Sequence, residues 1–105
     1  MLGIVDDVDA MAPDEIVSVL GDLPGWSADG VGAIVKQYEF TEFSRAIAFM
    51  TAAAIRAERM DHHPEWSNVY RRVNVRLSTH SARGVTDLDV QLARYMDEIA
   101  TGLGA

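Results

Sequence analysis

The feature that most constrains the fold of this chain is an alternation of apolar and polar side chains between Val69 and Leu77. Successive side chains of a strand point to opposite faces, so the pattern predicts a strand over residues 69–77 with one apolar face. The apolar positions are Val69, Val73, Val75 and Leu77. The opposite positions are Tyr70, Arg72, Asn74 and Arg76, and Arg71 is the one exception. Because an apolar face must be buried, we expect helices on one side of a sheet, with the polar side left to water or to another subunit.

The segment that precedes residue 41 predicts a short helix and a hairpin. Pro13 suits the first turn of a helix, and the two acidic residues after it favour the positive helix end, so a helix is expected over residues 13–20. Apolar and polar side chains alternate over residues 33–40, and this pattern predicts a strand. Gly30 and Gly32 precede this strand and place a hairpin loop beside them.

A long helix is predicted over residues 41–60, with Thr41 as its N-cap. Apolar residues recur along it at helical spacing. The stripe expected to face the core is Phe43, Ile47, Met50, Ala54 and Ala57. Pro64 disfavours helical geometry at His63, so the helix is expected to end soon after Met60.

The last helix has a capping box. Thr86 is the predicted N-cap, Asp89 occupies the N3 position, and Val85 with Val90 can form a hydrophobic staple. The helix is expected to continue to Gly102. Its predicted core side chains are Leu88, Leu92, Tyr95, Met96 and Ile99.

Together these elements predict an α+β fold in which an antiparallel sheet of about four strands carries three helices on one face. The expected order is helix, strand, strand, helix, strand, strand, helix. We expect one domain over residues 1–105, with residues 1–12 loosely ordered. The chain has 105 residues and no cysteine, so the fold must be stable without disulfides.

Composition excludes several classes of function. The chain has 9 basic and 16 acidic residues and a net charge of −7, which opposes direct binding of nucleic acid. No apolar run approaches the roughly 20 residues that a membrane-spanning helix needs. The first residues have neither the basic start nor the long apolar stretch of a signal peptide, so a cytoplasmic location is expected. Residues 1–42 are strongly acidic, whereas residues 43–105 hold all the arginines. We therefore expect the binding site for a small polar or anionic ligand in this second part of the chain, residues 43–105. The preference for arginine over lysine is compatible with a bacterium of high genomic GC content.

His62, His63 and His80 all lie in the second part and outside predicted helix interiors. Histidine titrates near neutral pH, so these are the first candidates for proton transfer. Side chains near them in the sequence could position or polarise the imidazoles. They are Glu58, Asp61, Glu65, Trp66, Tyr70 and Asp89.

Two other interpretations of the histidines remain open at this point. Three loop histidines could simply be solvated side chains. They could also bind a metal, but His62 and His63 are adjacent in an extended segment, where successive side chains diverge, and the chain lacks an H-E-x-x-H motif. We therefore predict no metal site.

The order and spacing of these residues resemble a known family. The motif is Glu58-x-x-x-His62-His63-Pro64-Glu65-Trp66-x-Asn68-Val69-Tyr70, followed by Thr79-His80, Gly84, Thr86 and Asp89. It is similar to the motif of the pterin-4a-carbinolamine dehydratases. The resemblance extends over about residues 23–100 and includes Gly25-Trp26 and the strand that ends at Phe40.

The resemblance implies a hydro-lyase, 4a-hydroxytetrahydrobiopterin dehydratase, that forms quinonoid dihydropterin during tetrahydrobiopterin recycling. It implies no cofactor and no metal. The residues that match the catalytic positions of the family are His62, His63 and His80. Those that match substrate-binding positions are Glu58, Asp61, Trp66 and Asp89. Asp89 is also the predicted capping residue of the last helix, and this structural role is an alternative for it.

The chemistry of the implied reaction suits imidazoles. Loss of water from the carbinolamine needs a proton delivered to the 4a-hydroxyl and another removed from N5, and general acid–base catalysis contributes about 10² to 10⁴-fold. For His80 to approach His62, the chain after Pro64 must run outward and return, because one straight strand would separate the two histidines by tens of ångströms. We therefore expect residues 64–69 to extend away from the site and the next strand to return.

The sequence departs from the family pattern at Arg71, Ser81 and Arg83, where asparagine, aspartate and glycine are frequent. Another class of function also remains open, because relatives of this fold serve as transcriptional coactivators or as assembly factors. The amphipathic strand and alanine-rich helix favour a homodimer or homotetramer, as in the family.

Overall fold

The computed structural model describes residues 9–30 and 32–105. Its elements are α1 (Pro13–Leu20), β1 (Ser27–Asp29), β2 (Ala33–Glu39), α2 (Phe43–Met60), β3 (Glu65–Val69), β4 (Arg72–Leu77), the 3₁₀ turn η2 (His80–Ala82) and α3 (Asp87–Gly102). The prediction of a loosely ordered segment covers residues 1–12, and residues 1–8 of it lie outside the described residues. The remaining residues 9–12 form neither helix nor strand, and the Met11 N–H donates to the Val85 carbonyl at 2.8 Å.

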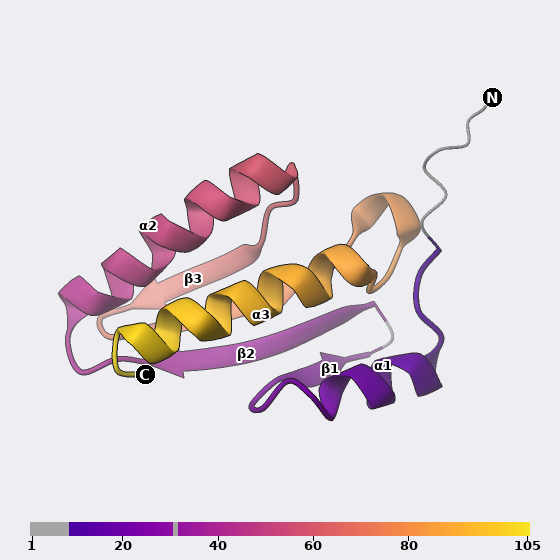
Figure 1. The fold of residues 1–105 in the computed structure, drawn as a ribbon, viewed down its shortest axis with the longest axis horizontal. Helices are drawn as coiled ribbons and strands as arrows, with labels where there is room; N and C mark the ends of the chain where they lie inside the picture. The colour runs from indigo at the N-terminus through magenta and orange to yellow at the C-terminus, as the bar shows by residue number, and fades with distance from the viewer. Residues whose placement is uncertain (1–8, 31) are drawn as a thin grey trace.

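The predicted α+β class and the order of elements are confirmed. The four strands form one antiparallel sheet in the order β1-β2-β4-β3. Helices α2 and α3 lie across one face of the sheet, and α1 lies beside β1 (Figure 1). β4 is an inner strand, and its buried Val73, Val75 and Leu77 face the helices, as the alternation predicts.

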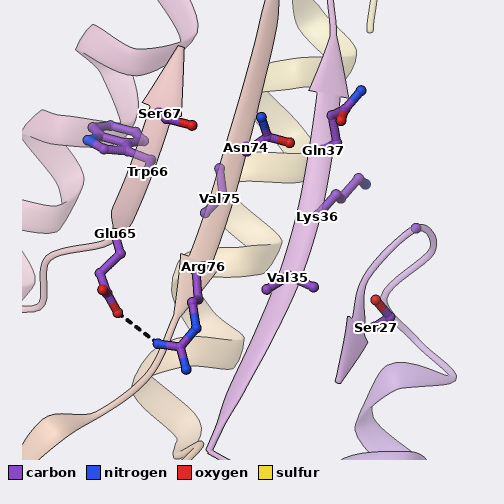
Figure 2. Close-up of a pocket in the computed structure, with 11 residues that line it drawn as sticks. Ser27, Val35, Lys36, Gln37, Glu65, Trp66, Ser67, Asn74, Val75 and Arg76 are labelled. Atoms are coloured by element: carbon purple, nitrogen blue, oxygen red, sulfur yellow. Dashed lines mark hydrogen bonds and ion pairs between the residues drawn. The ribbon is translucent and has the colours of Figure 1, made fainter. Parts of the chain in front are cut away.

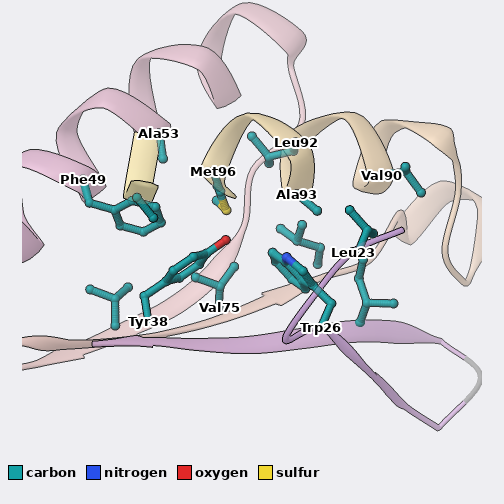
Figure 3. Close-up of a cluster of buried hydrophobic side chains, with 14 of the residues drawn as sticks. Leu23, Trp26, Tyr38, Phe49, Ala53, Val75, Val90, Leu92, Ala93 and Met96 are labelled. Atoms are coloured by element: carbon teal, nitrogen blue, oxygen red, sulfur yellow. The ribbon is translucent and has the colours of Figure 1, made fainter. Parts of the chain in front are cut away.

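The core lies between the sheet and the two long helices. Tyr38 and Trp26 meet Phe49 of α2 and Met96 of α3 there (Figure 3). The rings of Tyr38 and Phe49 have centroids 4.6 Å apart. Among the residues that the structure describes, no buried side-chain nitrogen or oxygen lacks a hydrogen-bond partner. In the same ranges, no helix is both long enough and apolar enough for a bilayer crossing.

The predicted core stripe of α2 is confirmed at Ala57, and Met50 packs against the core, but it is wrong at Phe43, Ile47 and Ala54. The buried residues are Ala46, Phe49, Ala53 and Ala57. Phe43 and Ile47 are 48% and 40% exposed, so these two apolar side chains lie outside the core, whereas Phe49 is buried in it. The helix also begins at Phe43 rather than Thr41, with Glu42 as the N-cap. The small alanines face inward because they let α2 approach its neighbours closely.

The strand predicted over residues 69–77 is confirmed over Arg72–Leu77, but its first three residues belong to the end of β3 and to a hairpin turn. Val69 ends β3 and pairs with Arg72 at the start of β4, and Tyr70 with Arg71 forms the turn. The turn breaks the alternation, so Val69 is 57% exposed and does not share the core face of β4. The exception noted at Arg71 therefore marks the turn.

One carboxylate fastens α3 to the sheet. Asp97 Oδ1 accepts hydrogen bonds from Tyr38 OH at 2.5 Å, Lys36 Nζ at 2.8 Å and Trp26 Nε1 at 3.1 Å. Lys36 Nζ also donates to the Pro24 carbonyl at 2.8 Å. Burial and the Asp97 carboxylate raise the pKa of Tyr38 far above its ordinary value.

Left-handed residues occur at three chain reversals. Asp61, Tyr70 and Arg83 have φ of 51°, 53° and 59°. Arg83 ends η2 with φ 59° and ψ 41°, a conformation that costs a non-glycine residue roughly 1 kcal/mol. Glycine, which the resemblance implies at this position, would adopt this conformation without that cost.

We predict that alkaline pH destabilises the protein through Tyr38. A phenol whose pKa is raised on folding contributes stability in full below about pH 10 and loses that contribution as the pH rises further. The free energy of unfolding, measured by urea denaturation from about pH 8 to pH 11, should fall more steeply for wild type than for Tyr38→Phe. Tyr70→Phe, which removes an exposed phenol, is the matched control. Parallel curves for wild type and Tyr38→Phe would contradict the assignment.

We also predict that Arg83→Gly stabilises the fold. Glycine removes the left-handed strain but gives the unfolded chain more freedom, so the net gain should be about 0.5 kcal/mol, or about 2–4 °C in Tm. Arg83→Ala is the control, because alanine removes the guanidinium and keeps the strain. If both variants raise Tm equally, strain is not the cause.

Candidate active site

The end of α2 fixes the backbone of His62. Asp61 is left-handed, its N–H donates to the Glu58 carbonyl at 3.1 Å, and the His62 N–H donates to the Ala57 carbonyl at 3.0 Å. These two bonds form a Schellman motif, which usually places glycine in the left-handed position. Pro64 follows and prevents further helix. The imidazole of His62 therefore extends from a rigid helix end rather than from a free loop.

The side chain of His62 is held by Asp89 of α3. Their Nε2 and Oδ1 atoms are 2.5 Å apart, and the two residues are 7% and 0% exposed. The other oxygen, Oδ2, accepts the Thr86 N–H at 2.9 Å and the Thr79 hydroxyl at 2.8 Å. The predicted capping box is confirmed, and the same carboxylate also contacts a candidate catalytic residue. Oδ2 therefore serves the structural role of Asp89 in the helix cap, and Oδ1 contacts His62. Direct substrate binding by Asp89 stays a prediction.

The third histidine returns to the first two through the β3–β4 hairpin. Residues 65–69 run outward as β3, and β4 returns beside them with Arg76 paired to Glu65. Thr79 and His80 follow β4 directly, which places them next to the segment before β3. The predicted outward and returning path is confirmed.

A cavity of about 310 Å³ lies where these segments meet. Its lining residues come from the end of α2, the end of β4, η2 and the start of α3. They are Asp61, His62, His63, Ser78, Thr79, His80, Ser81 and Leu88. The three histidines and Asp61 are therefore brought together at one cavity.

The other two histidines are exposed and face carboxylates. His63 Nε2 lies 3.0 Å from Glu58 Oε1, and His80 Nε2 lies 3.9 Å from Glu65 Oε1. Water screens such exposed pairs, so they add little to stability. Both imidazoles are open to solvent, with side chains 59% and 82% exposed, so they can exchange protons with water. The cavity thus combines one buried imidazole with two accessible ones, an arrangement suited to proton transfer.

Trp66 and Tyr70 do not line this cavity. Trp66 lines a larger one of about 490 Å³ that also involves the polar sheet face. There Arg76 is bound by two carboxylates, Glu65 at 2.8 Å and Asp29 at 3.0 Å, and the first of these pairs is drawn in Figure 2. These contacts raise the pKa of the Arg76 guanidinium. Its charge is already paired and no histidine lines this cavity, so the smaller cavity is the better candidate for acid–base chemistry.

Sequence reasoning missed several residues of the cavity. Ser78, Ser81 and Leu88 line it, and Thr79 adds a hydrogen bond to Asp89. Thr79 appeared only as part of a motif, because nothing in local spacing shows that it contacts a residue on the following helix. Within residues 9–30 and 32–105, including this cavity, no three His, Asp or Glu side chains cluster in a way that could hold a metal ion.

Comparisons with known proteins identify a family for the chain. The family described as pterin 4 alpha carbinolamine dehydratase matches residues 9–99. A Bordetella avium protein named "Putative pterin-4-alpha-carbinolamine dehydratase" is 54% identical over 87 residues, which are 82% of this chain and 81% of that protein. A Bradyrhizobium protein of the same name is 50% identical over 97 residues, 91% of this chain and 97% of the other.

Two solved structures are also similar. A crystal structure of a transcriptional coactivator/pterin dehydratase from Brucella melitensis has a TM-score of 0.85 and 47% identity, and the match covers 88% of this chain and 99% of that one. A pterin dehydratase-like protein identified as a RuBisCO assembly factor in the alpha-carboxysome has a TM-score of 0.63 and 22% identity, covering 72% and 89%, and shares the fold. On the family match and these identities, the chain belongs to the pterin 4 alpha carbinolamine dehydratase family.

Proposed function

We propose that this protein is a 4a-hydroxytetrahydrobiopterin dehydratase that removes water from the carbinolamine by general acid–base catalysis. The observation that carries the proposal is the meeting of His62, His63 and His80 at one cavity, with His62 held by the buried Asp89. The family membership supports the reaction class. In this proposal the pterin carbinolamine is the substrate, and the reaction uses no cofactor.

The proposed roles follow from the environment of each imidazole. His62 directs Nε2 to Asp89, so Nδ1 is the ring nitrogen left to accept the proton from pterin N5. The Asp89 carboxylate stabilises the imidazolium that this transfer forms. His80 is exposed and near Glu65, which suits it to deliver a proton to the departing 4a-hydroxyl. One proton leaves N5, one reaches the hydroxyl, and water departs, so the products are quinonoid dihydropterin and water.

The remaining residues bind and orient the substrate in this proposal. Asp61 lines the cavity, and Glu58 contacts His63 at 3.0 Å. Both carboxylates can accept hydrogen bonds from pterin N–H groups. Trp66 does not line the cavity, so we assign it no contact with the substrate; its side chain packs β3 against the core.

We predict that His62→Ala and His80→Ala each lower kcat for carbinolamine dehydration by about 10² to 10⁴-fold, because each removes one proton-transfer group. Absorbance of the carbinolamine, followed with several pterins, measures the rate above the spontaneous reaction. Gln91→Ala, on the exposed side of α3, is the matched control and should keep the wild-type rate. Should wild type give only the spontaneous rate with every pterin, the dehydratase proposal fails.

The alternative function is that of a non-catalytic protein-interaction module, a coactivator or an assembly factor. Association between copies of this chain is compatible with either function, and the exposed side of α2 supports it. Phe43 and Ile47 are four residues apart on one side of the helix and are 48% and 40% exposed, and Ile55 further along is 58% exposed. An apolar helix face of this kind marks a contact surface. We propose that it joins copies of this chain into a homodimer or homotetramer.

If α2 forms this contact, substitutions on its exposed side should lower the mass of the assembled protein in solution. A Phe43→Glu and Ile47→Glu double variant should sediment as a smaller species than wild type, because it buries two charges at the contact. Val17→Glu is the control, since Val17 lies on α1 and is already 71% exposed. A wild-type protein that sediments as a monomer would contradict the assembly.

A further inference from the structure

Two buried threonine hydroxyls lie behind the Asp89 carboxylate. Thr79 and Thr86 are 5% and 1% exposed, and their Oγ1 atoms are 2.7 Å apart. Thr79 Oγ1 is also 2.8 Å from Asp89 Oδ2. The two hydroxyls and the carboxylate therefore form a continuous chain of hydrogen bonds that ends, through Oδ1, at His62 Nε2.

The direction of this chain follows from counting protons. The Thr86 hydroxyl oxygen accepts the Leu88 N–H at 3.3 Å, and Thr79 Oγ1 is the acceptor within reach of its proton. Each hydroxyl has one proton to donate. If Thr86 donates to Thr79, Thr79 can donate to Asp89, and every buried group is satisfied. The opposite order would leave two oxygens, Thr79 Oγ1 and Asp89 Oδ2, facing each other without a proton between them.

This direction determines what Asp89 can do. Its Oδ2 accepts the Thr79 hydroxyl and the Thr86 N–H, so that oxygen carries no proton of its own. The ionised Asp89 then accepts from His62 Nε2–H through Oδ1 at 2.5 Å. The tautomer of a histidine is set by the partner of one ring nitrogen, so Nδ1 of His62 is left to act as a base.

We propose that Thr79 is a positioning residue that keeps Asp89 aligned as an acceptor and thereby holds His62 in the Nε2–H tautomer. It lines the cavity through the end of β4, but its hydroxyl acts on His62 through Asp89. The kinetic consequence rests on the proposed dehydratase function. The tautomer itself can be measured without any substrate.

The test compares Thr79→Val, which keeps the shape and removes the hydroxyl, with Thr79→Ser, which keeps the hydroxyl. The ¹⁵N shifts of the imidazole nitrogens distinguish the two tautomers, and a His62→Gln variant assigns the His62 signals. Thr79→Ser should retain the wild-type Nε2–H pattern. Thr79→Val should shift the signals toward a mixture of tautomers and lower kcat about tenfold with KM changed less than about twofold, because a hydrogen bond to a charged group is lost.

Two results would overturn the proposal. One is an unchanged His62 spectrum in Thr79→Val, and the other is a Thr79→Ser variant as altered as Thr79→Val, which would show that shape rather than the hydroxyl matters. Thr79→Ala gives the same comparison if the valine variant does not fold. If wild type does not accelerate dehydration, the proposed function fails, and the imidazole spectra still decide the role of Thr79.

Discussion

The arrangement of the candidate site depends on one buried carboxylate, that of Asp89. Its Oδ2 caps the first turn of α3 and holds the loop after β4, and its Oδ1 holds the histidine at the end of α2. Three elements far apart in the chain are thus fixed by two oxygen atoms. A fully buried carboxylate is tolerated only because donors surround it, and removing one donor leaves a costly unsatisfied charge. The same requirement that stabilises the fold therefore sets the geometry of His62.

Asp97 has a similar role further along α3. It accepts hydrogen bonds from Trp26, Lys36 and Tyr38, so it fastens the helix to β2 and to the segment before β1. The two carboxylates are eight residues apart on α3, little more than two helical turns. With both ends of the helix held, Asp89 has little freedom to withdraw from His62. The core contacts of α3 thereby act as support for the site, although none of them lines the cavity.

The order of helices and strands could be predicted from the sequence because it depends on patterns among neighbouring residues. The capping box at Thr86 and Asp89 and the alternation within β4 both use neighbouring residues, and both are confirmed. The core stripe of α2 was only partly right. Ala57 is buried, but Phe43 and Ile47 are apolar yet exposed, because hydrophobicity alone does not distinguish a core face from a contact face. The contacts of Thr79 with Asp89 could not be predicted, since they join a strand end to a helix across a turn whose shape depends on the left-handed Arg83.

The different environments of the histidines suit the two halves of the proposed reaction. A base that must take a proton from N5 benefits from a fixed tautomer and a buried counter-charge, which Asp89 supplies to His62. An acid that donates to a departing hydroxyl must be protonated again in each turnover, and this requires contact with water. His80, whose side chain is 82% exposed beside Glu65, meets that requirement. Burial at one side of the cavity and exposure at the other would thus let one residue hold its geometry while the other exchanges protons with solvent.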